Sequence, residues 1–227
     1  DQDIRNMGGL RKYMPITWFT SLVGSLALIG TPLFSGFYSK DSIIEAVHAS
    51  HLPGAGFAYF AVVFGVFVTA FYSFRMYFLV FHGKERFGQA AHDHHGDHDD
   101  EEPAADHHHG LAPGEKPHES PWVVTAPLVL LALPSVFIGY WTIQPLLFGD
   151  FFKDAIVTDI ARHPAMKELA EHFHSPGAMA AHALQTVPFW LAAAGVAVAW
   201  FFYLVKPAIP AAIGKALSPL VKVLENK

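Results

Sequence analysis

The sequence predicts an all-α, multi-pass membrane protein with four spanning segments, of which the first is a discontinuous helix. Charged residues make up only 15% of the 227 residues, against roughly 25% in ordinary soluble domains. Four stretches are apolar over about 20 residues, the length that a helix needs to cross a hydrocarbon core about 30 Å thick. The first stretch contains Gly30-Thr31-Pro32, and a proline inside a helix removes a backbone donor and disrupts the preceding turn.

The four apolar segments can be placed in order along the chain. We expect the first span at Ile16–Tyr38, which is uncharged, and the second at Gly56–Phe81, whose only charge is Arg75 near its end. The third, Pro121–Ile143, and the fourth, Val187–Val205, are also uncharged. Each segment is apolar around its whole circumference, which distinguishes it from an amphipathic helix lying on a membrane surface.

The helical pattern of the first span continues past Lys40 to His48. A single helix over residues 15–48 would be about 50 Å long, which exceeds the thickness of a bilayer core. Its midpoint falls at Pro32, which leaves Lys40 about 12 Å from the centre and still inside the hydrocarbon. We therefore expect a break at residues 30–32, as in transporter helices whose half-helix ends face an ion pathway.

Lys40 and Asp41 are the candidate functional residues. An ionisable group at membrane depth is costly, and such groups are usually functional and paired. Because burial disfavours the charged form of an amine while a nearby carboxylate favours it, a lysine with a carboxylate neighbour can load and release a proton. We predict that Lys40 is a proton carrier and Asp41 its charge partner. The alternative is that Lys40 marks the end of a span and extends to the lipid headgroups.

Basic residues near the span ends predict the orientation, since Lys and Arg concentrate on the inner side of a membrane. The loop 45–55 has no basic residue, whereas the opening segment carries Arg5, Arg11 and Lys12. We expect the amino end and the loop 82–120 to be cytoplasmic. The polar segment 144–186 is then periplasmic and is expected to hold two short amphipathic helices. The opening residues show neither an initiating Met nor a signal-peptide pattern, so we expect residue 1 to be an interior point of a longer protein.

The loop 82–120 holds nine of the fifteen histidines and ten acidic residues. A His- and Asp-rich tract can bind metal. This tract lacks a fixed ligand spacing and a hydrophobic anchor, so we favour a disordered, solvated linker and expect no metal site. The chain contains no cysteine, which excludes cysteine-ligated iron–sulfur clusters. The net charge of −5 comes mostly from this loop and gives no indication of nucleic-acid binding.

Two further polar groups support weaker hypotheses. One group on the second span either lines a water path or, as we favour, bonds to its own or neighbouring helices; it consists of Thr69, Tyr72 and Ser73. The other lies at the outer end of the broken element and forms either a proton exit or, as we favour, ordinary interfacial groups; it consists of Glu45, His48 and His51.

Three motifs carry a resemblance to a known family: MGGLRKYMPIT, ALIGTPLFSGFYSKDSI and FYSFRMYFLVFHGKER. They resemble subunit L of NADH-quinone oxidoreductase (respiratory complex I), the antiporter-like subunit that corresponds to mitochondrial subunit 5. The resemblance covers residues 1–87, and beyond them only hydropathy and order are similar. It implies a proton-translocating subunit of the bacterial inner membrane, driven by electron transfer from NADH to quinone elsewhere in an enzyme complex. By motif, Lys40 is the proton carrier, Asp41 its neighbour, and Gly30, Thr31 and Pro32 the helix break.

The resemblance also implies partners and an organisation. Residues 1–81 would end the second of two inverted repeats, and 121–227 would add two spans beyond the linker 82–120. The first repeat, the lateral helix and the last span of the family would lie outside this stretch. NADH, FMN, iron–sulfur clusters and quinone would belong to partner subunits, and none to this chain. Expected partners are the neighbouring antiporter-like subunits and the lipid bilayer. The rival hypotheses are the large subunit of a multisubunit sodium/proton antiporter and a structural membrane scaffold.

Overall fold

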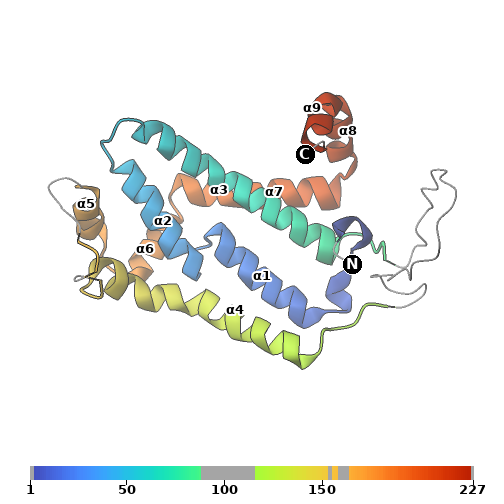
Figure 1. Cartoon of the computed structure of the whole chain (residues 1–227), viewed down its shortest axis with the longest axis horizontal. Helices are drawn as coiled ribbons and strands as arrows, with labels where there is room; N and C mark the ends of the chain where they lie inside the picture. Colours follow the sequence, from blue (N-terminus) through green and yellow to red (C-terminus); the bar gives the residue numbers. More distant parts are fainter. Residues whose placement is uncertain (1–2, 88–115, 153–154, 158–163, 226–227) are drawn as a thin grey trace, which may run out of the picture.

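The computed structural model of the chain describes residues 3–87, 116–152, 155–157 and 164–225. These residues form helices and turns, with no strand among them. The α-helices of these described residues are α1 Pro15–Ile29, α2 Ser35–His48, α3 Ala55–Tyr77, α4 Trp122–Ile143, α5 Ala165–His172, α6 Pro176–Ala183, α7 Val187–Trp200, α8 Ala208–Ala216 and α9 Ser218–Glu225. Figure 1 shows that α1, α3, α4 and α7 run along the long axis of the bundle, with α2 leaning toward the end that carries α5 and α6.

In the described part of the chain, three continuous helices are long and apolar enough to cross a membrane: Ala55–His82, Trp122–Phe148 and Val187–Val205. Each one ends in a π-helical turn, namely η3 Phe78–His82, η4 Gln144–Phe148 and η5 Phe201–Val205. The fourth span is the pair α1 and α2, interrupted at residues 30–34. The protein is therefore an all-α, multi-pass membrane protein whose first span is discontinuous, and this confirms the predicted fold class.

The third span is longer than the sequence predicts. Helical structure was expected to end at Ile143, but it continues through Gln144–Phe148. Leu147 and Phe148 pack against the cluster of buried residues that joins α2, α4 and α6. Because these apolar side chains have a partner surface, the polar Gln144 does not end the helix.

Small residues bring α3 and α7 into close contact. Ala192, Gly195 and Ala199 are buried along one face of α7, and Ala70 of α3 is fully buried opposite them. A Cβ at Gly195 would lie 2.6 Å from the Phe67 carbonyl oxygen and 2.8 Å from the Ala70 Cβ. Helices in lipid associate by this close backbone approach, because the surrounding lipid tails provide no hydrophobic drive between them.

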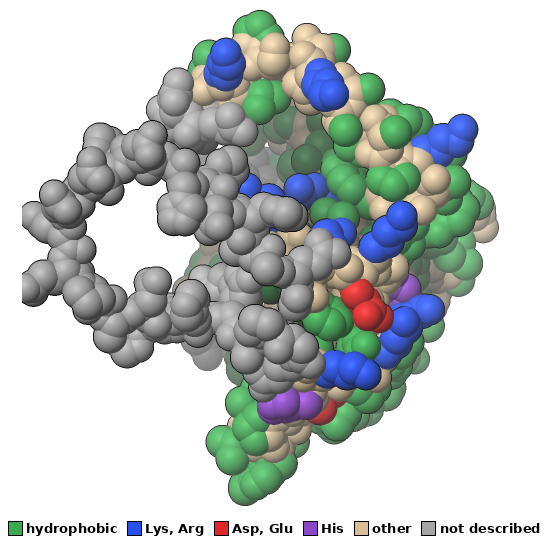
Figure 2. Space-filling view, turned by 90° about the vertical axis from the view of Figure 1, so that its right-hand side faces the viewer, with side chains coloured by type: hydrophobic (Ala, Val, Ile, Leu, Met, Phe, Trp, Pro, Cys, Tyr) green, Lys and Arg blue, Asp and Glu red, His purple; other side chains and the backbone are tan. Residues whose placement is uncertain are grey.

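Lys and Arg gather at one end of the bundle, here called the basic end, which faces the viewer in Figure 2. This end holds the amino-terminal segment, the residues after η3 and the helices α8 and α9 (Figure 1). The opposite end, here called the far end, holds α5, α6 and the connection between α2 and α3. Among the described residues, the only Lys or Arg on α5, α6 and the connections of the far end is Lys167.

Two of the sequence predictions concern segments that are described only in part. Of the loop 82–120, residues 88–115 lie outside the described residues, so the prediction of a disordered linker stays a prediction. Of the two amphipathic helices expected in 144–186, the stretch 158–163 is likewise not described. The helices α5 and α6 lie in this segment, and α5 buries Leu169 on one face while its other side chains are more exposed.

Candidate functional site

The break between α1 and α2 begins with a Schellman motif. Gly30 adopts the left-handed conformation at φ 77°, where a residue with a side chain would be strained. The Gly30 N–H donates to the Ala27 carbonyl at 3.2 Å, and the Thr31 N–H donates to the Leu26 carbonyl at 3.0 Å. These bonds satisfy two of the carbonyl groups that every helix leaves open at its carboxyl end. Pro32 follows and prevents the helix from continuing.

Lys40 binds a carbonyl group at this end of α1. Its Nζ donates a hydrogen bond to the Leu28 carbonyl oxygen. The carboxyl end of a helix carries a partial negative charge, so the site favours an ammonium group. Lys40 is half-buried, and its Cδ would lie 3.5 Å from a Cβ placed at Gly30. The lysine of α2 thus folds back over the break and lies against the end of the first half-helix.

Gly36 allows this close approach. A Cβ at Gly36 would run into the carbonyl group of Ala27, which is backbone and cannot rotate away. Only a glycine therefore lets the first turn of α2 pass the last turn of α1. Leu33 lies in the same connection with φ 75°, an uncommon conformation for a residue with a side chain.

A cavity of about 30 Å³ lies at the break. Its walls come from α1, α2, α3, α6, α7 and the connections that join α1 to α2 and α6 to α7. The polar side chains among its lining residues are Lys40, Asp41 and Thr186. A water molecule needs roughly 10–15 Å³ of such volume and two to four polar partners. The cavity is therefore large and polar enough for a water beside the lysine.

The structure brings together four of the five residues predicted from the sequence. Gly30, Pro32, Lys40 and Asp41 line the same small cavity. Thr31 contributes its backbone to the helix end and lines a separate cavity of about 450 Å³.

Asp41 does not contact the ammonium group of Lys40. Consecutive residues of a helix point about 100° apart, and among the described residues no ion pair joins Asp41 to a basic side chain. Asp41 is buried with 7% of its surface exposed. Glu45 lies one turn further along α2, on the side of the helix that carries Asp41. The direct partner of Lys40 is the Leu28 carbonyl.

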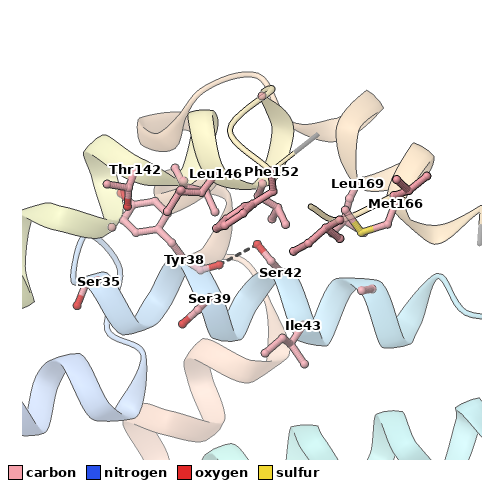
Figure 3. A pocket seen from close by; sticks show the side chains of 17 residues that line it. Ser35, Tyr38, Ser39, Ser42, Ile43, Thr142, Leu146, Phe152, Met166 and Leu169 are labelled. Carbon is pink, nitrogen blue, oxygen red and sulfur yellow. Dashed lines mark hydrogen bonds between the residues drawn. The ribbon is translucent and has the colours of Figure 1, made fainter. Parts of the chain in front are cut away.

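Another cavity lies elsewhere on α2. It has a volume of about 780 Å³ and lies between α2, the end of α4 and the segment around α5. Figure 3 shows Tyr38 and Ser42 facing Leu146, Phe152 and Leu169 across it. The Ser42 hydroxyl donates to the Tyr38 carbonyl at 2.8 Å, as such groups often do inside a helix. Because its wall is mostly apolar and Lys40 does not line it, this cavity is not where proton chemistry is expected.

The polar group on the second span does not line one path. Tyr72 is exposed by 52%, whereas Ser73 is buried with 2% exposed. We expected these hydroxyls to bond to their own or neighbouring helices. For Ser73 this prediction is wrong, since its Oγ is buried without a hydrogen-bond partner in the described part of the chain. The Tyr77 hydroxyl, one turn further along α3, is also buried without a hydrogen-bond partner among the described residues.

Glu119 caps the amino end of α1 from a distant part of the sequence. Its carboxylate accepts hydrogen bonds from the Ile16 N–H at 2.7 Å, the Thr17 N–H at 3.3 Å and the Thr17 hydroxyl at 2.7 Å. Partial burial raises the pKa of the Glu119 carboxyl, but these hydrogen bonds outweigh it and hold the pKa below its usual value. The cap satisfies amide groups that Met14, the preceding residue, leaves open.

We expect Glu119→Ala to lower the stability of the protein by about 1 kcal/mol, the typical cost of a lost helix cap. Because the folded-state pKa lies below the ordinary value of 4.5, this stabilisation is fully present above that pH and is lost as the pH falls through the folded-state pKa. Thermal unfolding of the purified full-length protein in detergent should show a gap between wild type and variant at pH 7 that closes in acid. A gap of the same size at every pH would contradict this assignment.

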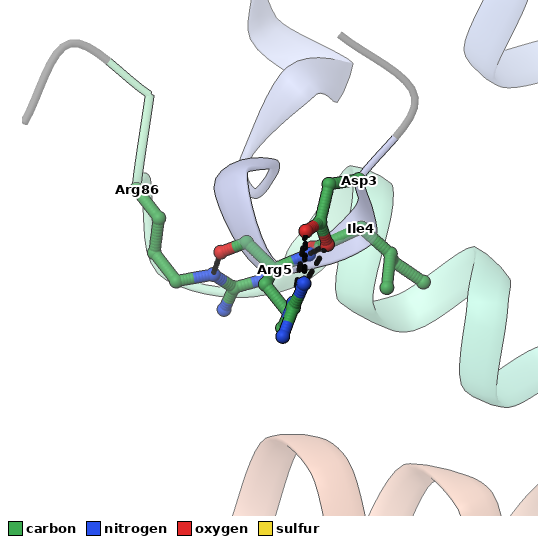
Figure 4. A network of polar contacts seen from close by, with 4 residues as sticks. All are labelled: Asp3, Ile4, Arg5 and Arg86. Carbon is green, nitrogen blue, oxygen red and sulfur yellow. Dashed lines mark hydrogen bonds and ion pairs between the residues drawn. The ribbon is translucent and has the colours of Figure 1, made fainter. Parts of the chain in front are cut away.

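Two segments at the basic end, MGGLRKYMP and HGKER, fold against each other. A Cβ at Gly9 would lie 2.7 Å from the Glu85 Cγ, and Lys12 Nζ forms an ion pair with Glu85 at 2.9 Å. That ion pair lowers the pKa of the Glu85 carboxyl. Figure 4 shows Arg86 reaching the amino-terminal turn, where its Nε donates to the Arg5 carbonyl at 2.8 Å. The segments MGGLRKYMP and HGKER therefore form one unit that fixes the start of α1 beside the end of the second span.

Some contributors to the site carry no signal in the sequence. Thr186 lines the lysine cavity from a position 146 residues beyond Lys40. The Leu28 carbonyl is backbone, and every residue has one. Glu119 lies in a polar stretch with many other acidic residues. Only the packing of the spans brings these groups to the two ends of α1.

Comparison with known proteins gives consistent relatives. Residues 1–71 match the family described as NADH:quinone oxidoreductase/Mrp antiporter, TM. Over all 227 residues the chain is 56% identical to NADH-quinone oxidoreductase subunit L of Neisseria meningitidis serogroup A, of which it covers 33%. It is 33% identical over 209 residues to subunit L of Mycobacterium tuberculosis, which covers 89% of this chain and 26% of that protein.

A relative with a different name agrees. NAD(P)H-quinone oxidoreductase chain 5 of Picosynechococcus is 44% identical over 151 residues, covering 61% of this chain and 20% of that protein. The chain spans about one third of the length of the subunit L proteins that it matches from end to end.

Proposed function

Because this chain belongs to the subunit L family of NADH-quinone oxidoreductases, we propose that it translocates protons across the membrane as part of complex I. In this proposal electron transfer from NADH to quinone, carried out by other subunits, drives the transport, and the whole assembly is a proton-translocating oxidoreductase. The chain contributes the end of an antiporter-like repeat, residues 1–81, and two further spans.

The observation that carries the proposal is the position of Lys40. Its ammonium group binds the Leu28 carbonyl at the carboxyl end of a broken half-helix, beside a small polar cavity. The helix end favours the charged lysine, whereas the surrounding apolar residues favour the neutral one. Two opposing influences of this kind make the protonation state sensitive to a nearby change in charge. Asp41 is buried and lines the same cavity; in this proposal it is the charge partner of the lysine.

We place Lys40 in the role of proton carrier. In the loaded state the ammonium group donates to the Leu28 carbonyl. When positive charge approaches from a neighbouring part of the membrane arm, the N–H bond breaks and the proton passes to a water in the cavity. Gly30, Thr31 and Pro32 hold the helix end open for this exchange. In this role the lysine needs flexibility of its side chain alone, and no movement of the spans.

The orientation follows from the distribution of charge. Among the described residues, the basic end carries Arg5, Arg11, Lys12, Lys84, Arg86, Lys116, Lys206, Lys215 and Lys222. Since basic residues favour the cytoplasmic side, we propose that the basic end faces the cytoplasm and the far end the periplasm of a bacterial inner membrane. The amino end and the loop 82–120 are then cytoplasmic.

The redox groups belong, in this proposal, to partner subunits. The chain has no cysteine to hold an iron–sulfur cluster, and its family relatives are named for a multi-subunit oxidoreductase. We propose that NADH, FMN, iron–sulfur clusters and quinone are bound elsewhere. The neighbouring antiporter-like subunits and the bilayer cover the exposed apolar faces of the spans, such as Phe57 and Phe60 of α3.

The first test separates complex I from the sodium/proton antiporter. Inside-out vesicles from cells that lack the full-length subunit should lose NADH-driven proton uptake, and the intact gene should restore it. Sodium-driven proton exchange in de-energised vesicles should be the same with and without the subunit. Sodium-dependent exchange that is lost and restored with the gene, while NADH-driven uptake stays unchanged, would favour the antiporter instead.

The same vesicles test the orientation. Protease added to them should cut the loop 82–120, because the proposed orientation exposes Lys84, Arg86 and Lys116 to the outer medium of inside-out vesicles.

A further inference from the structure

A second cavity, of about 550 Å³, lies at the far end beside the outer half of α2. Six titratable side chains from three helices and a turn line it: Glu45, His48, Glu168, His172, His174 and His182. The sequence pairs Glu45 and His48 with His51, but His51 is not among the lining residues. We call this cavity the far-end vestibule. Its histidines are exposed, so the vestibule opens to the aqueous phase.

The hydrogen bonds of two histidines fix which nitrogen can exchange a proton. His172 Nδ1 lies 2.8 Å from the Glu168 carbonyl, and His174 Nδ1 lies 2.8 Å from the His172 carbonyl. A carbonyl oxygen only accepts hydrogen bonds, so Nδ1 carries a hydrogen in both rings. The neutral imidazole then has its lone pair on Nε2. Both rings therefore present Nε2 as the atom that takes up and releases a proton.

The floor of the vestibule is apolar and well packed. Phe148 at the end of the third span stacks on Phe173, with ring centroids 4.2 Å apart. Leu169 of α5 is buried with 6% exposed, and Met179 of α6 packs against the same cluster. This packing attaches α5 and α6 to α2 and α4, so the histidines stand on a fixed frame beside Glu45.

The vestibule adjoins the lysine cavity through two elements. On α2, Asp41 lines the lysine cavity and Glu45, one turn further, lines the vestibule. On α6, Ala183 lines the lysine cavity and its neighbour His182 lines the vestibule. The residues that line the two cavities are therefore one helical turn apart on α2 and adjacent in the sequence on α6. A proton that leaves Lys40 or Asp41 toward the far end meets Glu45 and His182 first.

We propose that the far-end vestibule is the proton-release site of this subunit, with the imidazoles of His172, His174 and His182 as exchanging groups. In each transfer an N–H bond forms at an imidazole nitrogen as the O–H bond of an inner water or carboxyl group breaks, and the imidazolium then gives the proton to outer water. The groups that face these rings are Glu45 and His48 of α2 and Glu168 of α5. The His48 ring in turn lies against the Tyr59 ring of α3, with centroids 4.8 Å apart. This inference rests on the proposed function.

A metal site is the competing use of such side chains. Among the described residues no three His, Asp or Glu side chains are placed to hold one metal ion. His172 and His174 direct their Nδ1 atoms at backbone carbonyls, and the vestibule histidines are spread over α2, α5, α6 and the connection between α5 and α6. The arrangement suits exchange of protons through water, which requires no shared coordination centre.

The test replaces the three imidazoles in the full-length subunit within the assembled complex. We expect the triple variant His172→Gln, His174→Gln and His182→Gln to lower NADH-driven proton pumping at neutral pH by about tenfold. This loss is smaller than the roughly hundredfold effect of removing a positioned acid–base group, because water still carries part of the proton flux. Replacing the same residues by Glu restores a titratable group and should recover pumping. The optimum of the outer pH should then move to lower values, since a carboxyl holds its proton less firmly than an imidazole.

His118→Gln is the matched control, because this exposed histidine at the basic end also places Nδ1 against a backbone carbonyl, that of Glu119. It should leave pumping and its pH profile at wild-type levels. If the triple Gln variant fails to assemble, the single variant His182→Gln replaces it and should show a smaller loss of pumping. Wild-type pumping with an unchanged outer-pH profile would overturn the release site. That outcome leaves the proposed function standing if Lys40→Ala abolishes pumping.

Discussion

Lys40→Ala in the full-length subunit is expected to reduce NADH-driven proton pumping to less than about a tenth of the wild-type rate, because a positioned proton carrier typically contributes a factor of 100 or more. Coupled NADH–quinone turnover should fall with it. The variant removes the only side chain among the described residues that donates to the open end of α1. Inside-out vesicles allow both rates to be measured side by side, with assembly checked by the size of the solubilised complex.

Lys40→Arg separates a carrier from an anchor. Arginine keeps the positive charge and can reach the Leu28 carbonyl, but it does not release a proton at any working pH. A carrier role therefore predicts that pumping is lost in this variant too. If Lys40 only fixes the helix end or extends to headgroups, Lys40→Arg should pump normally. Lys215→Ala, at an exposed position of α8, is the control for loss of a positive charge and should leave pumping unchanged.

Gly36→Ala should have the second large effect, although it adds only a single methyl group. The new Cβ would run into the Ala27 carbonyl, so the first turn of α2 has to move away from α1. Overpacking of this kind costs about 1–3 kcal/mol. Because Lys40 lies one turn beyond Gly36 on the same helix, the shift of α2 separates the lysine ammonium group from the Leu28 carbonyl. We expect pumping to fall severalfold, together with a lower thermal stability of the complex.

Gly24→Ala is the matched substitution in the same broken span. Nothing lies within 4 Å of the Cβ position at Gly24, and alanine is favoured over glycine inside a helix by about 1 kcal/mol. This variant should pump as wild type does and be as stable or more stable. Equal effects of the two substitutions on pumping and on the unfolding temperature would mean that the approach of α1 and α2 at Gly36 does not position the lysine.

The spans could be predicted because their cause is local. A run of about 20 apolar residues has one stable arrangement in a bilayer, whatever its neighbours. The second and fourth spans accordingly begin and end within one residue of the predicted positions. The break was also local, since Gly30 can adopt a left-handed conformation and Pro32 cannot continue a helix. The third span ran five residues beyond the prediction, because its last turn gained partners from α2 and α6.

The sequence by itself determined the fold class, the four spans, the broken helix and the candidate lysine. Each of these depends on the properties of neighbouring residues along one segment. Only the tertiary structure decided what the lysine touches, and the answer, the Leu28 carbonyl, differs from the adjacent Asp41. It also joined Glu45 and His48 to histidines more than 120 residues away. Such contacts depend on how separate helices pack, and helix packing in lipid is set by small residues and close backbone approach, which no single segment encodes.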